Sequence, residues 1–371
     1  MIKKERLKKG FLSLVKINST SLKEGRIVKY LNSELKRLGL KTRIDNAGAK
    51  IGGVSGNLIG FLKGNVKNRD IILLNAHVDT VSSSVNIKPK ISRGVIRSDG
   101  RTILGADDKA GVAAILEVLR VLKERKIPHG DIQVIFTVAE EIGLLGAKAL
   151  SRRLLKADFG FSIDGGDVPI VLNKAPSQDN ISATVIGKAA HAGVHPEKGI
   201  NSIKVTSHAI AAMKLGRIDK ETTANIGIIK GGQATNIIPE EVEIKGEARS
   251  HSLRKLKAQV KHMKTKLKKA CRKYKAKLKI KVSPAYRSFN VSRRHRVLKI
   301  AVNAARSLGI KPKIKSTGGG SDANIFNRLG ISTIILGVGA SGVHTNRERI
   351  RIDDMVKGAR VILEAIELIA K

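Results

Sequence analysis

The chain is poor in cysteine, in aromatic residues and in long apolar stretches. Its 371 residues include one cysteine, Cys271, no tryptophan and only 3% aromatic side chains. A single cysteine excludes an internal disulfide framework. No stretch approaches the roughly 20 apolar residues that cross a bilayer, so no membrane partner is expected. The N-terminal segment has a very short apolar part and no small-residue cleavage site, so we expect no secretory signal and a cytoplasmic protein.

Acidic residues are also scarce. The sequence has 31 Asp and Glu against 71 Lys and Arg, which gives a formal net charge of +40. Clustered basic residues bind nucleic acids and other anionic surfaces by releasing counterions. The densest basic run, residues 254–281, has no glycine-rich nucleic-acid motif, and Tyr274 is its one aromatic residue. We therefore favour a solvated basic surface and do not expect a nucleic-acid partner, but a basic nucleic-acid-binding protein stays the alternative from another functional class.

Four apolar, β-branched runs each lead to residues that can bind a metal ion. Helical patterns at residues 110–125 and 297–309 alternate with these runs, as in a mostly parallel sheet covered by helices on both faces. Such sheets bind ligands beyond the carboxyl ends of their strands. The runs and their polar ends are 71–79 with His77 and Asp79, 132–141 with Glu140 and Glu141, 159–166 with Asp164, and 332–345 with His344.

The rhythm of the sequence changes between residues 177 and 287. Here we expect strand, helix, strand, strand, helix and strand, the split βαβ arrangement of a small four-stranded, ferredoxin-like sheet. The α/β pattern resumes afterwards. The predicted fold class is thus α/β, with a three-layer αβα catalytic domain (1–176 and 288–371) interrupted by a lid and dimerisation domain (177–287).

Paired carboxylates are the main chemical signal. Glu140 and Glu141 are adjacent after an apolar strand, an arrangement that a cation or a shared proton would stabilise. One of them can ligate a metal ion while the other acts as general base on water. An acidic helix start is the alternative interpretation of this pair, as a helix N-cap is for Asp107 and Asp108.

The ligand types favour two metal ions. His77 and Asp79 lie two residues apart, so their side chains share one face, and a carboxylate there can orient a ligating histidine. Five ligands with one shared carboxylate suit a pair of ions. Imidazole and carboxylate without thiolate fit Zn²⁺, and Mn²⁺ or Co²⁺ would also be accepted.

At this point the sequence resembles the metallopeptidase superfamily that includes peptidase T, aminoacylase and glutamate carboxypeptidases, and most closely its peptidase T-like branch. The resemblance covers nearly the whole chain. It is carried by DNAGAKIGGVSGNLIG, NAHVDTV, TILGADDKAG, TVAEEIGLLGAKAL, GKAAHAGVHPEKGINSI, TNIIPEEVEIKGEARSH, GGGSDANIF and GVHTNRERI.

The resemblance implies a role for each candidate residue. His77, Asp107 and Asp164 would hold one zinc ion, and Asp107, Glu141 and His344 the other, with Asp107 as the bridge and a cis peptide bond after it. Glu140 would be the general base and later proton donor, and Asp79 would orient the site. In the lid domain, His191, Asn236 and Arg249 would bind the substrate, His191 often across a dimer, and Gly319 would line the pocket.

The predicted function is therefore hydrolysis of short peptides by a tripeptide aminopeptidase-like exopeptidase. A hydroxide that bridges two zinc ions would attack the amide carbonyl, with Glu140 as the general base. A homodimer through the lid domain is expected. An N-acyl amino acid deacylase or a carboxypeptidase of the same superfamily is the alternative, since nothing in the sequence fixes the substrate.

Overall fold

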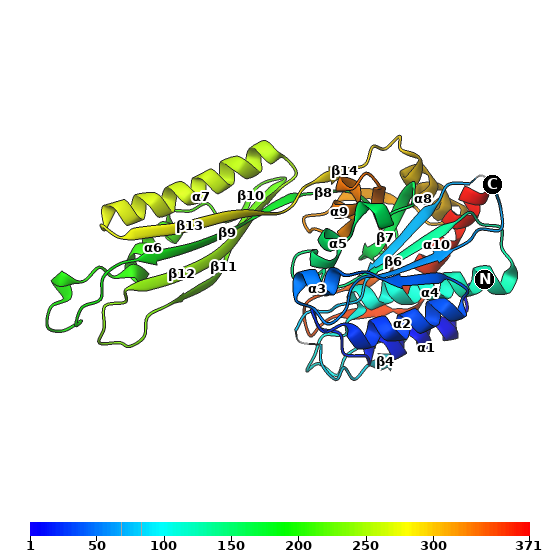
Figure 1. The fold of residues 1–371 in the computed structure, drawn as a ribbon, viewed down its shortest axis with the longest axis horizontal. Coiled ribbons are helices and arrows are strands. Elements are labelled where there is room, and N and C mark those ends of the chain that lie inside the picture. Colours follow the sequence, from blue (N-terminus) through cyan, green and yellow to red (C-terminus); the bar gives the residue numbers. More distant parts are fainter. Residues whose placement is uncertain (68, 83) are drawn as a thin grey trace. The chain divides into compact units, whose positions relative to one another are not determined.

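The structure is a computed structural model, and it describes residues 1–371 apart from Asn68 and Ser83. The described residues form two compact units, shown in Figure 1. The first unit comprises Met1–Lys174, Phe289–Thr317 and Ser321–Lys371, and the second comprises Ala175–Ser288 and Gly318–Gly320. The second unit is thus an insertion into the sequence of the first.

A mostly parallel sheet lies at the centre of the first unit. Its order is β1-β2-β6-β3-β7-β16-β8-β14, and β15 pairs with β8. The middle strands β6, β3, β7 and β16 are parallel, whereas β1 and β2 join antiparallel at one edge. The strands are β1 (Lys41–Ile44), β2 (Leu58–Leu62), β3 (Ile72–His77), β6 (Ile132–Thr137), β7 (Phe159–Gly165), β8 (Ile170–Ala175), β14 (Phe289–Asn290), β15 (Lys313–Ser316) and β16 (Ser332–Gly337).

Helices cover both faces of this sheet, which confirms the predicted three-layer α/β class. On one face α4 packs against β3 and β7, α1 and α10 pack against α4, and α8 packs against α10. On the other face α9 contacts β16 and β7, and α5 contacts α9. The helices are α1 (Lys4–Val15), α2 (Gly25–Arg37), α3 (Ala47–Ile51), α4 (Ala106–Arg125), α5 (Leu145–Ala149), the 3₁₀ turn η1 (Arg152–Leu154), α8 (Arg296–Ser307), α9 (Asp322–Arg328) and α10 (Ile352–Ala370).

Two covered faces explain why the central strands are apolar throughout. Every residue of β3 and of β6 is buried, because successive side chains point into opposite layers. Leu73 and Ile135 face the layer of α5 and α9, where they pack with Leu150, Leu155 and Phe326. The polar residues that end these strands therefore emerge at one edge of a rigid, tightly packed sheet.

A smaller sheet accompanies the first unit, in the order β17-β18-β5-β4. Its strands are β4 (Lys90–Ser92), β5 (Val95–Arg97), β17 (Ala340–Ser341) and β18 (Arg349–Arg351). The β17–β18 connection carries His344 and Glu348. Among the described helices, none combines the length and the hydropathy that crossing a membrane requires.

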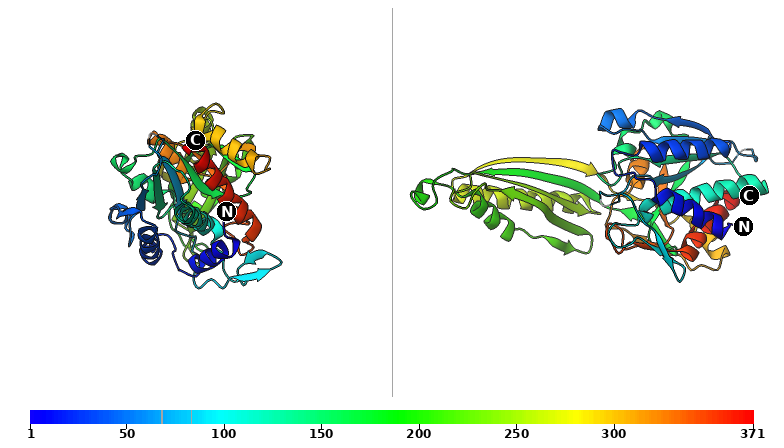
Figure 2. Two further views of the ribbon diagram at one scale, coloured as in Figure 1. Left: turned by 90° about the vertical axis from the view of Figure 1, so that its right-hand side faces the viewer. Right: turned by 90° about the horizontal axis from the view of Figure 1, so that it is seen from below.

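The second unit is a ferredoxin-like sheet in the order β10-β11-β12-β9-β13, with two helices on one of its faces (Figure 2). It contains five strands rather than the expected four, because the short edge strand β10 was not predicted. β10 spans four residues and has no apolar run that would identify it in the sequence. The elements are β9 (Ser177–Ile186), η2 (Pro196–Lys198), α6 (Ser202–Ala211), β10 (Gly216–Asp219), β11 (Thr222–Gly231), β12 (Glu241–Ser250), α7 (Leu253–Lys273) and β13 (Lys277–Tyr286).

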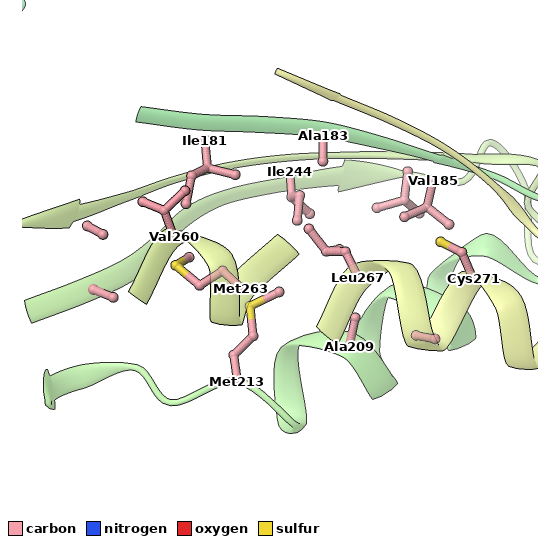
Figure 3. Close-up of a cluster of buried hydrophobic side chains, with 14 of the residues drawn as sticks. Ile181, Ala183, Val185, Ala209, Met213, Ile244, Val260, Met263, Leu267 and Cys271 are labelled. Atoms are coloured by element: carbon pink, nitrogen blue, oxygen red, sulfur yellow. The ribbon is translucent and has the colours of Figure 1, made fainter. Parts of the chain in front are cut away.

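An aliphatic core joins the helices of the second unit to its sheet (Figure 3). Ile181 and Ile244 project from the strands toward Met263 and Leu267 of α7, and Cys271 is buried in the same cluster. Cys271 is thus a packing residue of this core. Because α7 packs its apolar side here, its ten Lys and Arg residues occupy the rest of its surface, and the helix has no acidic residue.

Candidate active site

The end of β3 carries a histidine whose orientation is fixed by its neighbour. His77 is 2% exposed, and its Nδ1 lies 3.0 Å from the backbone oxygen of Asp79 and 3.4 Å from Asp79 Oδ1. A proton on Nδ1 can be donated to Asp79, which leaves the lone pair of Nε2 directed at other groups. The carbonyl of Asp79 is the nearer acceptor, and its carboxylate lies close enough to interact with His77 as well.

That carboxylate holds the turn after β6. Asp79 Oδ1 accepts the backbone N–H of Glu140 at 2.9 Å, and Oδ2 accepts the N–H of Glu141 at 3.1 Å and the hydroxyl of Ser21 at 2.6 Å. Burial opposes ionisation of Asp79, but the hydrogen bonds from His77, Ser21 and Glu140 outweigh it and lower the pKa of the carboxyl. Asp79 therefore joins the ends of two neighbouring parallel strands.

Asp107 lies between two imidazoles. Its Oδ1 is 3.3 Å from Nε2 of His77, and its Oδ2 is 3.3 Å from Nε2 of His344. The peptide bond between Asp107 and Asp108 is cis. Burial opposes ionisation here too, yet His344 and His77 together hold the pKa of Asp107 far below its usual value. Each oxygen of one carboxylate thus faces a different histidine.

Two groups of ligand-type side chains share Asp107. In each group one ligand atom per residue lies within 4.8 Å of the others. His77 Nε2 is also 3.9 Å from Asp164 Oδ1, and His344 Nε2 is 2.9 Å from Glu141 Oε2. The groups are His77, Asp107 and Asp164, and Asp107, Glu141 and His344. The structure thus brings together all five predicted ligands, in the two sets that the sequence resemblance implies.

Close packing of α4 against β7 places Asp164. A Cβ on Gly111 would lie 2.2 Å from the backbone oxygen of Ile163 and 2.5 Å from Oδ1 of Asp108, so no larger residue fits. Asp108 Oδ1 accepts the N–H of Gly111 at 3.2 Å. Asp108 therefore caps the first regular turn of the helix, as its N-cap interpretation predicts, while Asp107 faces the histidines.

Glu140 is a buried carboxylate beside both groups but a member of neither. Burial raises its pKa well above the usual range, the positive His77 opposes this shift, and the charges of Asp164, Asp322 and Glu141 reinforce it. Burial and the charge of Asp107 likewise raise the pKa of Asp164. Hydrogen bonds to Asp107 and Glu141 raise the pKa of His344 to about 10.

This concentration of acids fits bound cations. Burial raises the pKa values of Glu140 and Asp164, and repulsion between neighbouring carboxylates raises them further. A divalent cation in each group would offset it, and imidazole with carboxylate is a donor set for Zn²⁺, Mn²⁺ or Co²⁺. The residues present are therefore suited to a pair of metal ions.

Glu348 is a supporting residue that the sequence did not single out. Its Oε2 accepts the N–H groups of Leu104 and Gly105, each at 2.7 Å, and its Oε1 accepts the N–H of Asp107 at 3.0 Å. It fixes the turn that leads into Asp107 and ties it to the loop that bears His344. The signal that could have found it is its place in the GVHTNRERI motif, four residues after His344.

A polar network lies inside the sheet beneath the ligands. Asn75 donates to the backbone oxygen of Ile135 at 3.1 Å, Ser162 donates to Asn75 Oδ1 at 2.7 Å, and Thr137 donates to Asp322. Asp322 belongs to the GGGSDANIF motif and is buried, which raises its pKa to about 6. This motif therefore contributes Asp322 to the first unit, whereas its glycines group with the second unit.

Two of the predicted substrate-binding residues are neighbours in the second unit. His191 forms an isolated bridge with Ile237, and the N–H of Ala192 donates to the backbone oxygen of Asn236 at 2.9 Å. Nδ1 of His191 accepts the N–H groups of Gly193 and Val194, at 3.2 and 3.1 Å. Its ring proton is consequently on Nε2, on the exposed side of the loop, as a hydrogen-bond donor.

Arg249 lies at the other end of β12. It pairs bidentately with Glu247, at 2.7 and 2.9 Å, while the loop of Asn236 enters β12 at Glu241. Eight residues of strand span about 26 Å, so within this unit Arg249 is well separated from His191 and Asn236. Gly319 lies between β15 and α9, in the short segment that groups with the second unit. These four residues therefore do not form one cluster within the unit.

Comparison with known proteins agrees with this geometry. The sequence pattern of peptidase family M20/M25/M40 matches residues 73–368. A peptidase T from Fusobacterium nucleatum subsp. nucleatum is 28% identical over all of this chain and 90% of its own length.

Two solved structures are closely similar. A tripeptidase from Staphylococcus aureus is 43% identical, with a TM-score of 0.94 over 100% of this chain and 99% of its own. The aminopeptidase PepT from Bacillus cereus is 42% identical, with a TM-score of 0.89 over the full length of both chains. Since the family pattern spans most of the sequence and every candidate metal ligand, the chain belongs to peptidase family M20/M25/M40.

Proposed function

We propose that this peptidase is a di-zinc exopeptidase that removes the N-terminal residue from short peptides, tripeptides above all. The observation that carries the proposal is the position of Asp107, whose two oxygens face His77 and His344, each 3.3 Å away. A carboxylate placed between two separate ligand groups suits a pair of metal ions. His77 and Asp164 would complete one site, and His344 and Glu141 the other.

The two ions, when bound, would polarise the amide carbonyl and lower the pKa of a water molecule. Glu140 is the carboxylate beside both groups that neither of them uses, and we assign it as the general base. It would take one proton from the attacking water as the new C–O bond forms. It would then give that proton to the leaving amine as the C–N bond breaks, so that protons balance across the reaction.

His191 is suited to help stabilise the charge that develops on the carbonyl oxygen. Its Nδ1 is committed to two backbone N–H groups, which leaves Nε2–H as the donor. A fixed donor directed at a developing oxyanion commonly contributes about 10²–10³-fold in rate. Asn236 is held beside it by the hydrogen bond from the N–H of Ala192, and it would add a second polar group. Arg249 would bind a substrate carboxylate, and Gly319 would line the pocket.

The substrate class draws support from the names of similar proteins. The two solved structures at 43% and 42% identity are a tripeptidase and an aminopeptidase. A panel of di-, tri- and tetrapeptides, N-acetylated tripeptides, C-terminally amidated tripeptides and N-acyl amino acids would test the assignment. We expect free tripeptides to be cleaved, and amidated tripeptides to be cleaved with a higher KM because they lack the carboxylate assigned to Arg249. Preferred cleavage of N-acylated substrates would instead identify a deacylase or a carboxypeptidase.

Glu140→Ala tests the mechanism. We expect this variant to bind as much zinc as the unchanged enzyme and to lose about 10³-fold or more in kcat. Glu140→Gln, which keeps the size of the side chain, should be equally impaired. Turnover in either variant at the level of the unchanged enzyme would refute the assignment of the base. Location in the cytoplasm and dimerisation through the lid domain stay predictions, and light scattering on the purified protein tests the second.

A further inference from the structure

A fully buried carboxylate outside the proposed ligands lies against the turn that carries Glu140. Glu24 precedes α2, outside residues 73–368 that the family pattern matches, and it is 0% exposed. Its Oε1 accepts the backbone N–H of Leu22 and the backbone N–H of Ala139, each at 2.9 Å. Its Oε2 has no hydrogen-bond partner among the described residues. A charge-bearing group in this setting calls for an explanation.

Both N–H groups that Glu24 accepts belong to residues in the left-handed region. Leu22 has φ 70° and Ala139 has φ 51°, and neither is a glycine. Side chains other than glycine disfavour this conformation, and they keep it where the surrounding structure enforces it. One oxygen of Glu24 thus joins two strained residues that are 117 positions apart in the sequence.

The strained residue Ala139 directly precedes the proposed general base. Four consecutive N–H groups, those of residues 138–141, each donate to a side-chain oxygen. Asp79 accepts the N–H groups of Glu140 and Glu141, and Asn57 accepts that of Val138 at 3.2 Å. Glu24 supplies the remaining acceptor, at the residue where the chain turns out of β6.

The segment around Glu24 is itself anchored to the end of β3. Thr20 forms a parallel bridge with Thr80, and the hydroxyl of Ser21 donates to Asp79. The segment that carries Glu24 is therefore tied to residues 79 and 80, which directly follow the strand that ends at His77.

We propose that Glu24 is a positioning residue for Glu140, which it serves by holding Ala139 in the left-handed conformation that directs Glu140 toward the ligand groups. This inference rests on the proposed function, because it takes Glu140 as the base. This role requires an acceptor oxygen that reaches the N–H of Ala139, and it does not require a negative charge. Glutamine provides that oxygen without the charge, whereas aspartate keeps the charge and is one methylene too short.

The test compares Glu24→Gln, Glu24→Asp and Glu24→Ala in the zinc-loaded enzyme with a tripeptide substrate. We expect Glu24→Gln to keep kcat within about threefold, and Glu24→Asp and Glu24→Ala to lose at least about tenfold in kcat with little change in KM. Zinc bound per chain should equal that of the unchanged enzyme in all three. The acidic limb of the kcat–pH profile should be unmoved in Glu24→Gln.

A matched control is Glu34→Ala. Glu34 is a buried glutamate of the neighbouring helix α2 that pairs with Arg37 and Arg120, away from the turn. Its loss should lower the melting temperature and leave kcat unchanged, which separates positioning from general destabilisation. If Glu24→Ala does not fold, the comparison of kcat between Glu24→Gln and Glu24→Asp tests the inference by itself.

Two results overturn the inference. One is an active Glu24→Asp with an impaired Glu24→Gln, which would indicate a role for the charge. The other is unchanged kcat in Glu24→Asp and Glu24→Ala. Glu140→Ala, assayed alongside, keeps the two hypotheses apart: its activity would refute the proposed function, whereas an inactive Glu140→Ala beside an active Glu24→Ala would refute only the positioning role.

Discussion

The candidate metal centre and the candidate substrate-binding loop are held in opposite ways. In the first unit, Asp79, Asp107 and Glu140 are each fixed by buried or partly buried hydrogen bonds to residues distant in the sequence. In the second unit, His191 and Asn236 lie on exposed connections outside the strands, held by a few local backbone contacts. The ligand groups are therefore preorganised, while the loop residues have room to adjust to a substrate.

The two units also differ in how they carry charge. The acids of the first unit gather inside it, where burial and mutual repulsion raise several of their pKa values. In the second unit, helix α7 carries ten basic residues. Among the described residues of this helix, only Lys255 forms ion pairs with acidic residues, and its partners are Asp219 and Glu221. This contrast indicates that metal binding should depend on the first unit alone.

Removing the shared carboxylate should have the largest effect. We expect Asp107→Ala to lose both metal ions and all measurable turnover, because each ligand group then lacks its common member. His344→Ala should lose one ion only. Metal analysis of the purified proteins measures both, with Asp99→Ala as the control, because Asp99 pairs with the exposed Arg101 and belongs to neither ligand group. Two ions still bound to Asp107→Ala would contradict the shared-ligand assignment.

A change in the second unit should affect turnover but not metal binding. His191→Ala removes the proposed donor to the carbonyl oxygen, and we expect about a 10²-fold loss in kcat with unchanged zinc content. The nearby His195, exposed and paired with Glu197, offers a matched control in His195→Ala. Equal kcat in the two variants would argue against a role for His191.

The core of the second unit should affect stability without reaching the metal centre. Leu267 is fully buried between α7 and the sheet, and Leu267→Ala should lower the free energy of unfolding of this unit by about 2–5 kcal/mol. Urea denaturation followed by circular dichroism measures this change, and Lys268→Ala on the exposed side of the same helix should be nearly neutral. Loss of zinc from folded Leu267→Ala would contradict the expectation that metal binding depends on the first unit alone.

The smallest effect concerns pH. Burial raises the pKa of Glu24 to about 7, above its ordinary value of 4.5. A folded-state pKa above the unfolded value means that the native protein binds the proton more tightly, so stability is present below pH 4.5 and is lost as pH rises to 7. In the metal-free protein, the free energy of unfolding should fall by on the order of 1–3 kcal/mol across this range because of Glu24. Glu24→Gln should remove this fall. Identical pH dependence of unfolding in both proteins would contradict the raised pKa.

The strand-end ligands could be predicted from the sequence because each follows an apolar run. His77 and Asp164 lie at the carboxyl ends of buried parallel strands, and Glu141 lies four residues beyond the end of a third, so all three meet at one edge of the sheet. Helix α4 and the split βαβ order of the second unit could likewise be predicted from the spacing of apolar residues. These features depend on local patterns, which are visible in the sequence alone.

The supporting residues could not be found in this way. Glu24 contacts Ala139 across 115 positions and Glu348 contacts Leu104 across 244, so no local spacing connects them. Glu24 is a lone glutamate in an ordinary polar stretch, and Glu348 is marked only by its place in the GVHTNRERI motif. Their roles depend on backbone N–H groups of distant turns, which only the folded chain brings near.

The most direct test of the two-metal account is a crystal structure of the zinc-loaded protein with anomalous scattering data at the zinc edge. We predict two anomalous peaks on either side of the Asp107 carboxylate, one beside His77 and Asp164, the other beside Glu141 and His344. A single peak, or peaks that do not share Asp107, would contradict the account.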